Sequence, residues 1–184
     1  MRFHRTLVTL VAAAAIALPL GAGAQTATDA KGGMPQADRK FMMNVARDGM
    51  AEVELGKLAA QKGNSDAVKQ FGQRMADDHG KANDELKNLA QQKGLTLPTD
   101  LDSKHKQAMD RLSKLSGADF DRAYVNDMVR DHRKDVNEFK READRAKDPD
   151  LKSWAQKTLP TLEDHLKQVQ QLQAQVKSAP RAAR

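Results

Sequence analysis

Three histidines and one glutamate stand at positions from which they could bind a metal ion together. Each lies in the apolar stripe of its own predicted helix, so each faces the core: Glu52, His79, His132 and His165. Imidazole nitrogens and a carboxylate oxygen suit zinc, copper, iron or nickel. Counting from the predicted helix ends places all four near the middle third of the helices, where they can converge. The sequence therefore predicts either one mononuclear metal site for Cu, Zn or Fe, or a buried network in which Glu52 pairs with a histidinium.

Four further side chains accompany two of these histidines. Met75 and Met128 each precede an inward histidine by four residues and share its helix face. Their thioethers are soft ligands that favour Cu(I), and they are also ordinary core filler. Asp78 and Asp131 directly precede the same histidines and point toward the flank of the helix. There they could orient a histidine of the neighbouring helix, or simply be solvated.

Other kinds of catalytic or metal-binding chemistry find little support in the sequence. The chain has no cysteine, which excludes thiolate metal sites and disulfides. Outside the four inward residues, no arrangement of acid, base and nucleophile is recognisable. The sequence therefore does not indicate an enzyme and predicts no catalytic residues.

The elements that must position these residues are all helices. Removal of a signal peptide would remove Ile16, the only isoleucine, and the remainder is rich in helix-forming Ala, Leu, Lys and Gln. Gly and Pro signals and the 3.6-residue periodicity predict four long helices and one short helix, over residues 38–62, 66–93, 102–115, 116–146 and 148–177. Asp38 and Ser116 are predicted N-caps, Ser116 within a capping box with Asp119. Two short connections and one long one predict an all-α four-helix bundle whose single long crossover contains the short helix. In that topology the second and third long helices are parallel.

The chain divides into four predicted parts. Residues 1–24 have the positive start, apolar stretch and small-residue cleavage site of a secretory signal peptide. Residues 25–36 form a flexible lead, 37–177 the bundle, and 178–184 a basic tail. No integral membrane span is expected after the signal peptide is removed.

The charge pattern argues against nucleic acid as a partner. The formal net charge is +6 and 30% of residues are charged, but aromatic residues make up only 4%. Opposite charges recur four residues apart, as in Lys81 and Glu85, which is typical of a solvated helix surface. The basic, aromatic-lined face of a nucleic-acid binder is not evident.

A weak internal repeat links the second and third long helices. Seven positions match at a constant offset of 53 residues, and the matched set includes an Asp-His pair in both helices: Phe71, Met75, Asp78, His79, Glu85, Leu86 and Ala90 with Tyr124, Met128, Asp131, His132, Glu138, Phe139 and Ala143. Shared amphipathic periodicity explains the apolar matches but not the repeated Asp-His.

Three residues that disturb helices lie near the inward residues. Pro160 lies inside the last helix, one turn before His165, where it either opens the centre for a ligand or bends the helix around the core. Gly49 and Gly56 flank Glu52 by about one turn, which leaves either room for a ligand or a close helix contact.

Several of these motifs resemble an exported ferritin-like family catalogued as domain of unknown function 4142. The resemblance covers residue 38 to about 172 and rests on the stretches Gly49–Val53, Met75–His79, Phe120–Tyr124 and Leu159–His165. It implies a ferritin-like four-helix bundle in the periplasm, or at the outer membrane, of a Gram-negative bacterium. Ferritin-like relatives bind two irons through Glu and Glu-x-x-His motifs. No Glu-x-x-His occurs in this chain, so the resemblance extends at most to a mononuclear site.

Two functions follow as hypotheses. The first is an exported binding protein whose bundle holds one transition-metal ion at Glu52, His79, His132 and His165. The second is a structural or stress-response protein of the cell envelope whose polar core only fixes the helix register, and which acts through contacts with the envelope or with a protein partner.

Overall fold

Residues 33–178 are described by a computed structural model of the chain. The predicted signal peptide, residues 25–32 of the predicted lead and residues 179–184 of the predicted tail lie outside the described residues. Within the described part, no helix combines the length and apolar character that crossing a membrane requires.

The described residues form five helices, and the prediction of an all-α bundle is confirmed. The helices are α1 (Gln36–Lys62), α2 (Asp66–Gln92), α3 (Ser103–Ser113), α4 (Gly117–Arg145) and α5 (Pro149–Ser178). The predicted bounds differ from these by only a few residues. Pro160 lies inside α5, which continues through it as one helix.

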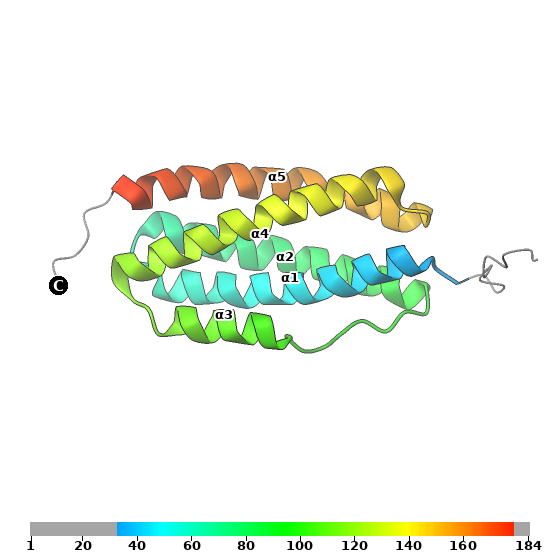
Figure 1. The fold of residues 1–184 in the computed structure, drawn as a ribbon, viewed down its shortest axis with the longest axis horizontal. Helices are drawn as coiled ribbons and strands as arrows, with labels where there is room; N and C mark the ends of the chain where they lie inside the picture. The colour runs from blue at the N-terminus through cyan, green and yellow to red at the C-terminus, as the bar shows by residue number, and fades with distance from the viewer. Residues whose placement is uncertain (1–32, 179–184) are drawn as a thin grey trace, which may run out of the picture. The chain divides into compact units, whose positions relative to one another are not determined.

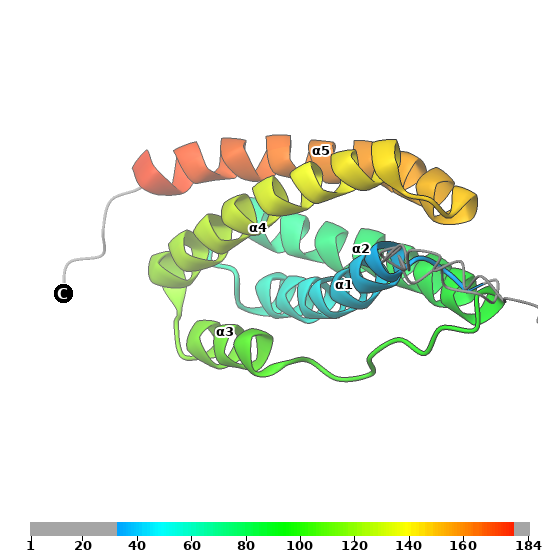
Figure 2. The same ribbon diagram turned by 45° about the vertical axis from the view of Figure 1, so that its right-hand side comes forward.

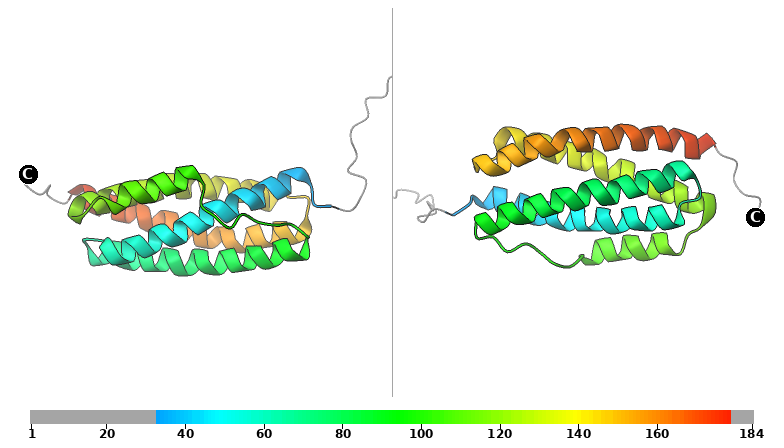
Figure 3. Two further views of the ribbon diagram at one scale, coloured as in Figure 1. Left: turned by 90° about the horizontal axis from the view of Figure 1, so that it is seen from below. Right: turned by 180° about the vertical axis from the view of Figure 1, so that it is seen from behind.

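Two helical hairpins pack against each other to make the bundle. In Figure 1, α1 and α2 form one antiparallel pair, and α4 and α5 form the other. The long connection after α2 returns along the outside of the bundle and carries α3, which lies beside α1 (Figures 2 and 3). As predicted, α2 and α4 run in the same direction.

Side chains close some helix starts as the sequence predicts and others differently. Ser65 Oγ accepts the Val68 N–H at the start of α2. The predicted cap at Asp38 is wrong, because the first helix begins at Gln36, two residues earlier. Ser116 is the N-cap residue of α4, as predicted, but its side chain makes no cap hydrogen bond. Asp119 forms an ion pair with Arg122 at 2.8 Å.

Two buried aspartates fasten each hairpin to the turn of the other. Asp38 Oδ2 accepts the N–H groups of Lys147 and Asp148 in the α4–α5 turn, at 3.0 and 2.7 Å. Asp121, which stands 83 residues after Asp38, accepts those of the equivalent residues in the α1–α2 turn: Asn64 at 2.8 Å and Ser65 at 2.9 Å. The shared spacing of 83 residues indicates that α1–α2 and α4–α5 are two copies of one hairpin. The predicted 53-residue offset compares two parallel helices with similar inward faces.

The hydrophobic core is divided into two clusters along the bundle. One includes Phe71, Tyr124 and Val169, and the other includes Leu86, Phe139 and Leu162. On every long helix, the inward ionisable residue falls between the stretch that enters one cluster and the stretch that enters the other: Glu52 on α1, His79 on α2, His132 on α4 and His165 on α5. All four are buried. The predicted common height is therefore a polar layer between two apolar halves.

Glycines allow α1 and α2 to pack closely. A Cβ on Gly56 would lie 2.7 Å from the Gly72 carbonyl oxygen, and a Cβ on Gly72 would lie 2.7 Å from that of Gly56. Of the two alternatives for Gly56, the structure therefore supports a close helix contact. A Cβ on Gly49 would lie 2.2 Å from Asn83 Oδ1, so the amide of Asn83 occupies the space beside it.

Substitution of Gly56 by alanine should destabilise the protein. The added Cβ meets backbone atoms of α2 that can move only if the helices separate, and such overpacking costs about 1–3 kcal/mol. Gly80→Ala is the matched control, since a Cβ there meets nothing within 4 Å and alanine favours a helix interior by about 0.5–1 kcal/mol. Urea unfolding should therefore give free energies that change in opposite directions. Equal stability of the two variants would contradict the contact between α1 and α2.

Glu142 should make stability depend on pH. Burial and the nearby Asp38 carboxylate raise the pKa of Glu142 from 4.5 to about 7. The neutral side chain therefore contributes stability that is complete below about pH 4.5 and is lost as the pH rises through 7. Glu142→Gln stays neutral, so we expect its melting temperature to exceed that of the parent at pH 8 and to match it at pH 4. The same comparison with Glu54→Gln, at an exposed site, should give no such change. A constant difference for E142Q would contradict the assignment.

Candidate metal centre

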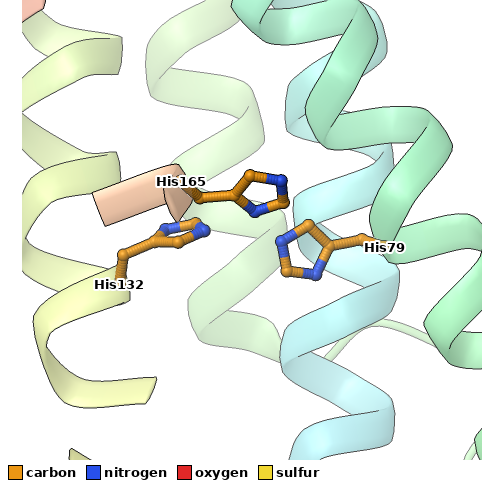
Figure 4. Close-up of side chains that lie close together, drawn as sticks. All are labelled: His79, His132 and His165. Atoms are coloured by element: carbon orange, nitrogen blue, oxygen red, sulfur yellow. The ribbon is translucent and has the colours of Figure 1, made fainter. Parts of the chain in front are cut away.

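The rings of three histidines form a nearly equilateral triangle in the polar layer. Their centroids are 5.5 Å apart for His79 and His132, 5.3 Å for His79 and His165, and 5.4 Å for His132 and His165. One nitrogen of each ring lies within 4.8 Å of the corresponding nitrogen of the other two. Figure 4 shows the rings converging from α2, α4 and α5, with a nitrogen of each directed at the space between them. The structure thus brings together the three histidines that the sequence predicts to converge.

The outer nitrogen of each ring has a hydrogen-bond acceptor. His79 Nδ1 lies 3.0 Å from Glu52 Oε2, and His165 Nε2 lies 2.8 Å from Asp78 Oδ2. His132 Nδ1 lies 3.1 Å from the Met128 carbonyl oxygen, one turn earlier on α4. Because all three partners accept, each outer nitrogen carries a proton. Each inner nitrogen then presents a lone pair.

The inner nitrogens have no hydrogen-bond partner, although they are buried. They are His79 Nε2, His132 Nε2 and His165 Nδ1. Buried polar groups are almost always paired in folded proteins, and a group without a partner calls for an explanation such as an ion. Three such nitrogens facing one space make a set of donors directed at a single point.

Electrostatics favour a neutral imidazole beside an ionised carboxylate. Burial would raise the pKa of Glu52, but the adjacent His79 and His132 lower it to about 2. Burial lowers the pKa of His132 to about 4, against the opposing effect of Glu52, and burial likewise lowers the pKa of His165. The lone pairs of His132 and His165 are therefore available at neutral pH.

Glu52 lies behind the histidines rather than between them. Besides its bond to His79, its Oε1 lies 3.6 Å from His132 Nδ1. Both contacts are with outer nitrogens, so the carboxylate is on the side of these rings that faces away from the shared space. In this arrangement Glu52 orients His79 and supplies negative charge. Its direct ligation of an ion stays a prediction.

The two aspartates beside the histidines have different surroundings. Asp78 accepts from His165 on the neighbouring helix and pairs with Arg74, whose Nη2 lies 2.7 Å from Asp164. The pKa of Asp78 is lowered because these two partners outweigh its partial burial. Asp131 pairs with Arg130. A link from the histidine layer to the protein surface therefore runs through Asp78.

The predicted sulfur ligands lie in the core. The Met75 and Met128 side chains are fully buried in the hydrophobic cluster that includes Phe71 and Tyr124. Phe71 contacts the His165 ring at a centroid distance of 6.3 Å. Apolar residues thus close the polar layer on this side and exclude water from it.

A second carboxylate in the layer was missed by the sequence analysis. Asp135 is only 7% exposed, and one of its oxygens lies within 4.8 Å of donor atoms of both Glu52 and His132. Burial and the Glu52 charge raise its pKa well above the ordinary value. The expectation of a single inward carboxylate is therefore wrong. Two signals could have identified Asp135: it stands three residues after His132, and 83 residues after Glu52.

The remaining described histidine is separate from the centre. His105 lies on α3, as predicted, and its Nε2 is 3.2 Å from Asp48 on α1. The hydrogen bond to Asp48 raises the pKa of His105, and this effect is larger than the lowering caused by partial burial. His105 therefore holds α3 against α1.

The sequence profile of the family described as "Domain of unknown function (DUF4142)" matches residues 23–172. The chain belongs to this family. The resemblance that the sequence motifs indicate is thus confirmed. No curated protein sequence matches this DUF4142 chain significantly.

Solved structures share the fold of this DUF4142 protein. A DUF305 fragment from Deinococcus radiodurans has a TM-score of 0.68 at 12% identity, covering 78% of this chain and 99% of its own. A DUF305 protein from Streptomyces coelicolor, described as secreted, has a TM-score of 0.66 at 16% identity, covering 80% and 98%. CopM in the Cu(I)-bound form has a TM-score of 0.63 at 16% identity, covering 75% and 96%. At these identities the likeness establishes the fold alone.

Proposed function

We propose that this protein is an exported helical-bundle protein, periplasmic or associated with the outer membrane of a Gram-negative bacterium, that binds one transition-metal ion. Three nitrogens supply the proposed ligands: His79 Nε2, His132 Nε2 and His165 Nδ1. One observation carries the proposal. These buried nitrogens lack partners, while the opposite nitrogen of each ring is bonded to an acceptor.

The same observation favours a metal over a network that only fixes helix register. In such a network the inner nitrogens would bond to one another or to a carboxylate, and among the described residues they do neither. Each buried group without a partner costs about 1–3 kcal/mol. An ion bound to all three lone pairs removes that cost at one point. The anchored outer N–H groups are the arrangement that metal-binding histidines commonly adopt.

Charge balance makes Cu(I) the first ion to test. Three neutral imidazoles add no charge and Glu52 adds one negative charge, so a monovalent ion leaves the layer neutral. A divalent ion such as zinc would leave one positive charge in a dry core, which is unfavourable unless Asp135 also ionises. The fold shared with CopM in the Cu(I)-bound form supports the same choice.

His132→Ala should abolish metal binding. The substitution removes one of the three proposed nitrogen ligands. Alanine is a strong helix former, so α4 should still fold. We expect calorimetric titration and metal analysis of untagged protein to give one ion per chain for the parent and none for the variant. His105→Ala removes a histidine outside the centre and should keep one ion per chain. If the folded parent binds neither copper, zinc nor iron at micromolar levels, the proposed function is wrong.

Asp78→Asn should weaken metal binding without abolishing it. The carboxylate fixes the proton of His165 on Nε2, and loss of such a partner typically costs about 10–100-fold in metal affinity. Asp77→Asn is the matched control, because it removes the same charge one residue away, where the exposed side chain bonds only to Gln73. Competition with a chelator of known affinity measures both variants. Equal affinities would contradict the orienting role of Asp78.

A further inference from the structure

The proposed ligands are buried, so an ion must pass between helices to reach them. His132 and His165 have no exposed surface, and His79 has 6%. An inner cavity of about 20 Å³, the size of a single water molecule or ion, lies against His79 and Glu52. Any route from solvent that reaches this cavity reaches the polar layer.

A second, outer cavity of about 110 Å³ lies between α2 and α5. It is lined by Asp78, Lys81, Glu85, Lys157 and Thr161, together with Ala82 and Thr158. Ala82 and Thr158 also line the inner cavity. The wall between the outer and inner cavities therefore consists of two short side chains, one from each helix.

We propose that metal ions enter the three-histidine centre between α2 and α5, passing from the outer cavity to the inner one between Ala82 and Thr158, and that the side chain at position 158 controls the rate of entry. This inference rests on the proposed function. It assigns to Thr158 a role in access rather than in ligation.

The backbone of α5 lacks one hydrogen bond close to this point. Pro160 has no N–H to donate to the Gln156 carbonyl oxygen, so the helix lacks one backbone hydrogen bond next to Thr158. The Thr158 hydroxyl donates to the Trp154 carbonyl oxygen at 2.9 Å, a bond that commonly bends helices. The turn of α5 that carries Thr158 is therefore held by one backbone hydrogen bond fewer than an interior turn without proline. That Pro160 opens the centre for a ligand stays a prediction.

The outer cavity also connects to the centre through Asp78. Its side chain is 35% exposed, lines the outer cavity and bonds directly to His165. An arriving cation thus meets a carboxylate that belongs to the support of the site. From there it passes to the inner cavity, where the Glu52 carboxylate stands against His79.

Two other cavities approach the inner one but are more firmly closed. A cleft of about 520 Å³ beneath residues 95–99 shares only Asn83 with it, and that amide fills the space beside Gly49. A cavity of about 20 Å³ between α1, α3 and α4 shares Asp48, Glu52 and Asp135 with it. Lys134 and His105 cover that cavity, and both are bonded to Asp48. In both cases the shared side chains are longer than those of Ala82 and Thr158.

Trp154 offers a direct measurement of the route. It is the only tryptophan of the chain, and it lines the inner cavity. Stopped-flow mixing of the full protein with Cu(I) under anaerobic conditions should change its fluorescence as the ion arrives. We expect Thr158→Leu to slow this phase at least about tenfold, because a larger side chain narrows the passage between the outer and inner cavities. The equilibrium Kd should stay unchanged. Thr158→Ala should accelerate the same phase.

Two control variants separate the effect of side-chain size at position 158 from other effects of substitution. Thr158→Val has nearly the volume of threonine without the hydroxyl, and should load at the parent rate. Thr96→Leu makes the same change of size in the separate cleft, and should also load at the parent rate.

If T158L and T158A both load at the parent rate with unchanged Kd, the route is wrong although the metal site stands. If T158L does not fold, T158A alone decides. Absence of copper, zinc and iron binding in the parent would instead refute the proposed function, and the route with it.

Discussion

The hydrogen bonds at the outer nitrogens of three core histidines are the interaction on which the rest of the molecule depends. They fix ring orientation and proton position at once, so that three lone pairs face one space. Such polar groups are tolerated in a core only when they are held there. The apolar clusters on either side hold the layer at one height. The hydrogen bonds that Asp38 and Asp121 accept from the opposite turns keep the hairpins from sliding past each other.

The fold was largely predictable from the sequence because its signals are local. Gly and Pro at helix ends, and apolar periodicity, gave five helices and their connections within a few residues. The exception has a long-range cause. Asp38 resembles a local cap, but it accepts hydrogen bonds from a turn more than one hundred residues away. A capping signal in the sequence indicates that a side chain can accept hydrogen bonds from backbone N–H groups. It does not indicate which N–H groups these are.

The candidate site was predictable as a set of residues but not as an arrangement. Periodicity identified the three histidines and Glu52, because stripe positions face the core whatever their chemistry. It could not say which ring nitrogen faces inward, since that depends on acceptors from other helices. It also missed Asp135, which lies to one side of the main stripe of α4. Comparison of whole hairpins at 83 residues, rather than of single helices, pairs Asp135 with Glu52.

The centre is asymmetric although its scaffold repeats, and the asymmetry determines where it can be reached. At the 83-residue spacing His165 corresponds to Ala82, and His132 corresponds to Gly49. Both histidines of the α4–α5 hairpin are therefore matched by small residues of the α1–α2 hairpin, whereas His79 corresponds to Leu162. One of these, Ala82, forms half of the thin wall between α2 and α5, while Asn83 fills the space beside Gly49. On the side of the layer between α2 and α5, the short side chains of Ala82 and Thr158 line both cavities, and this is the side on which we place the proposed entry of an ion.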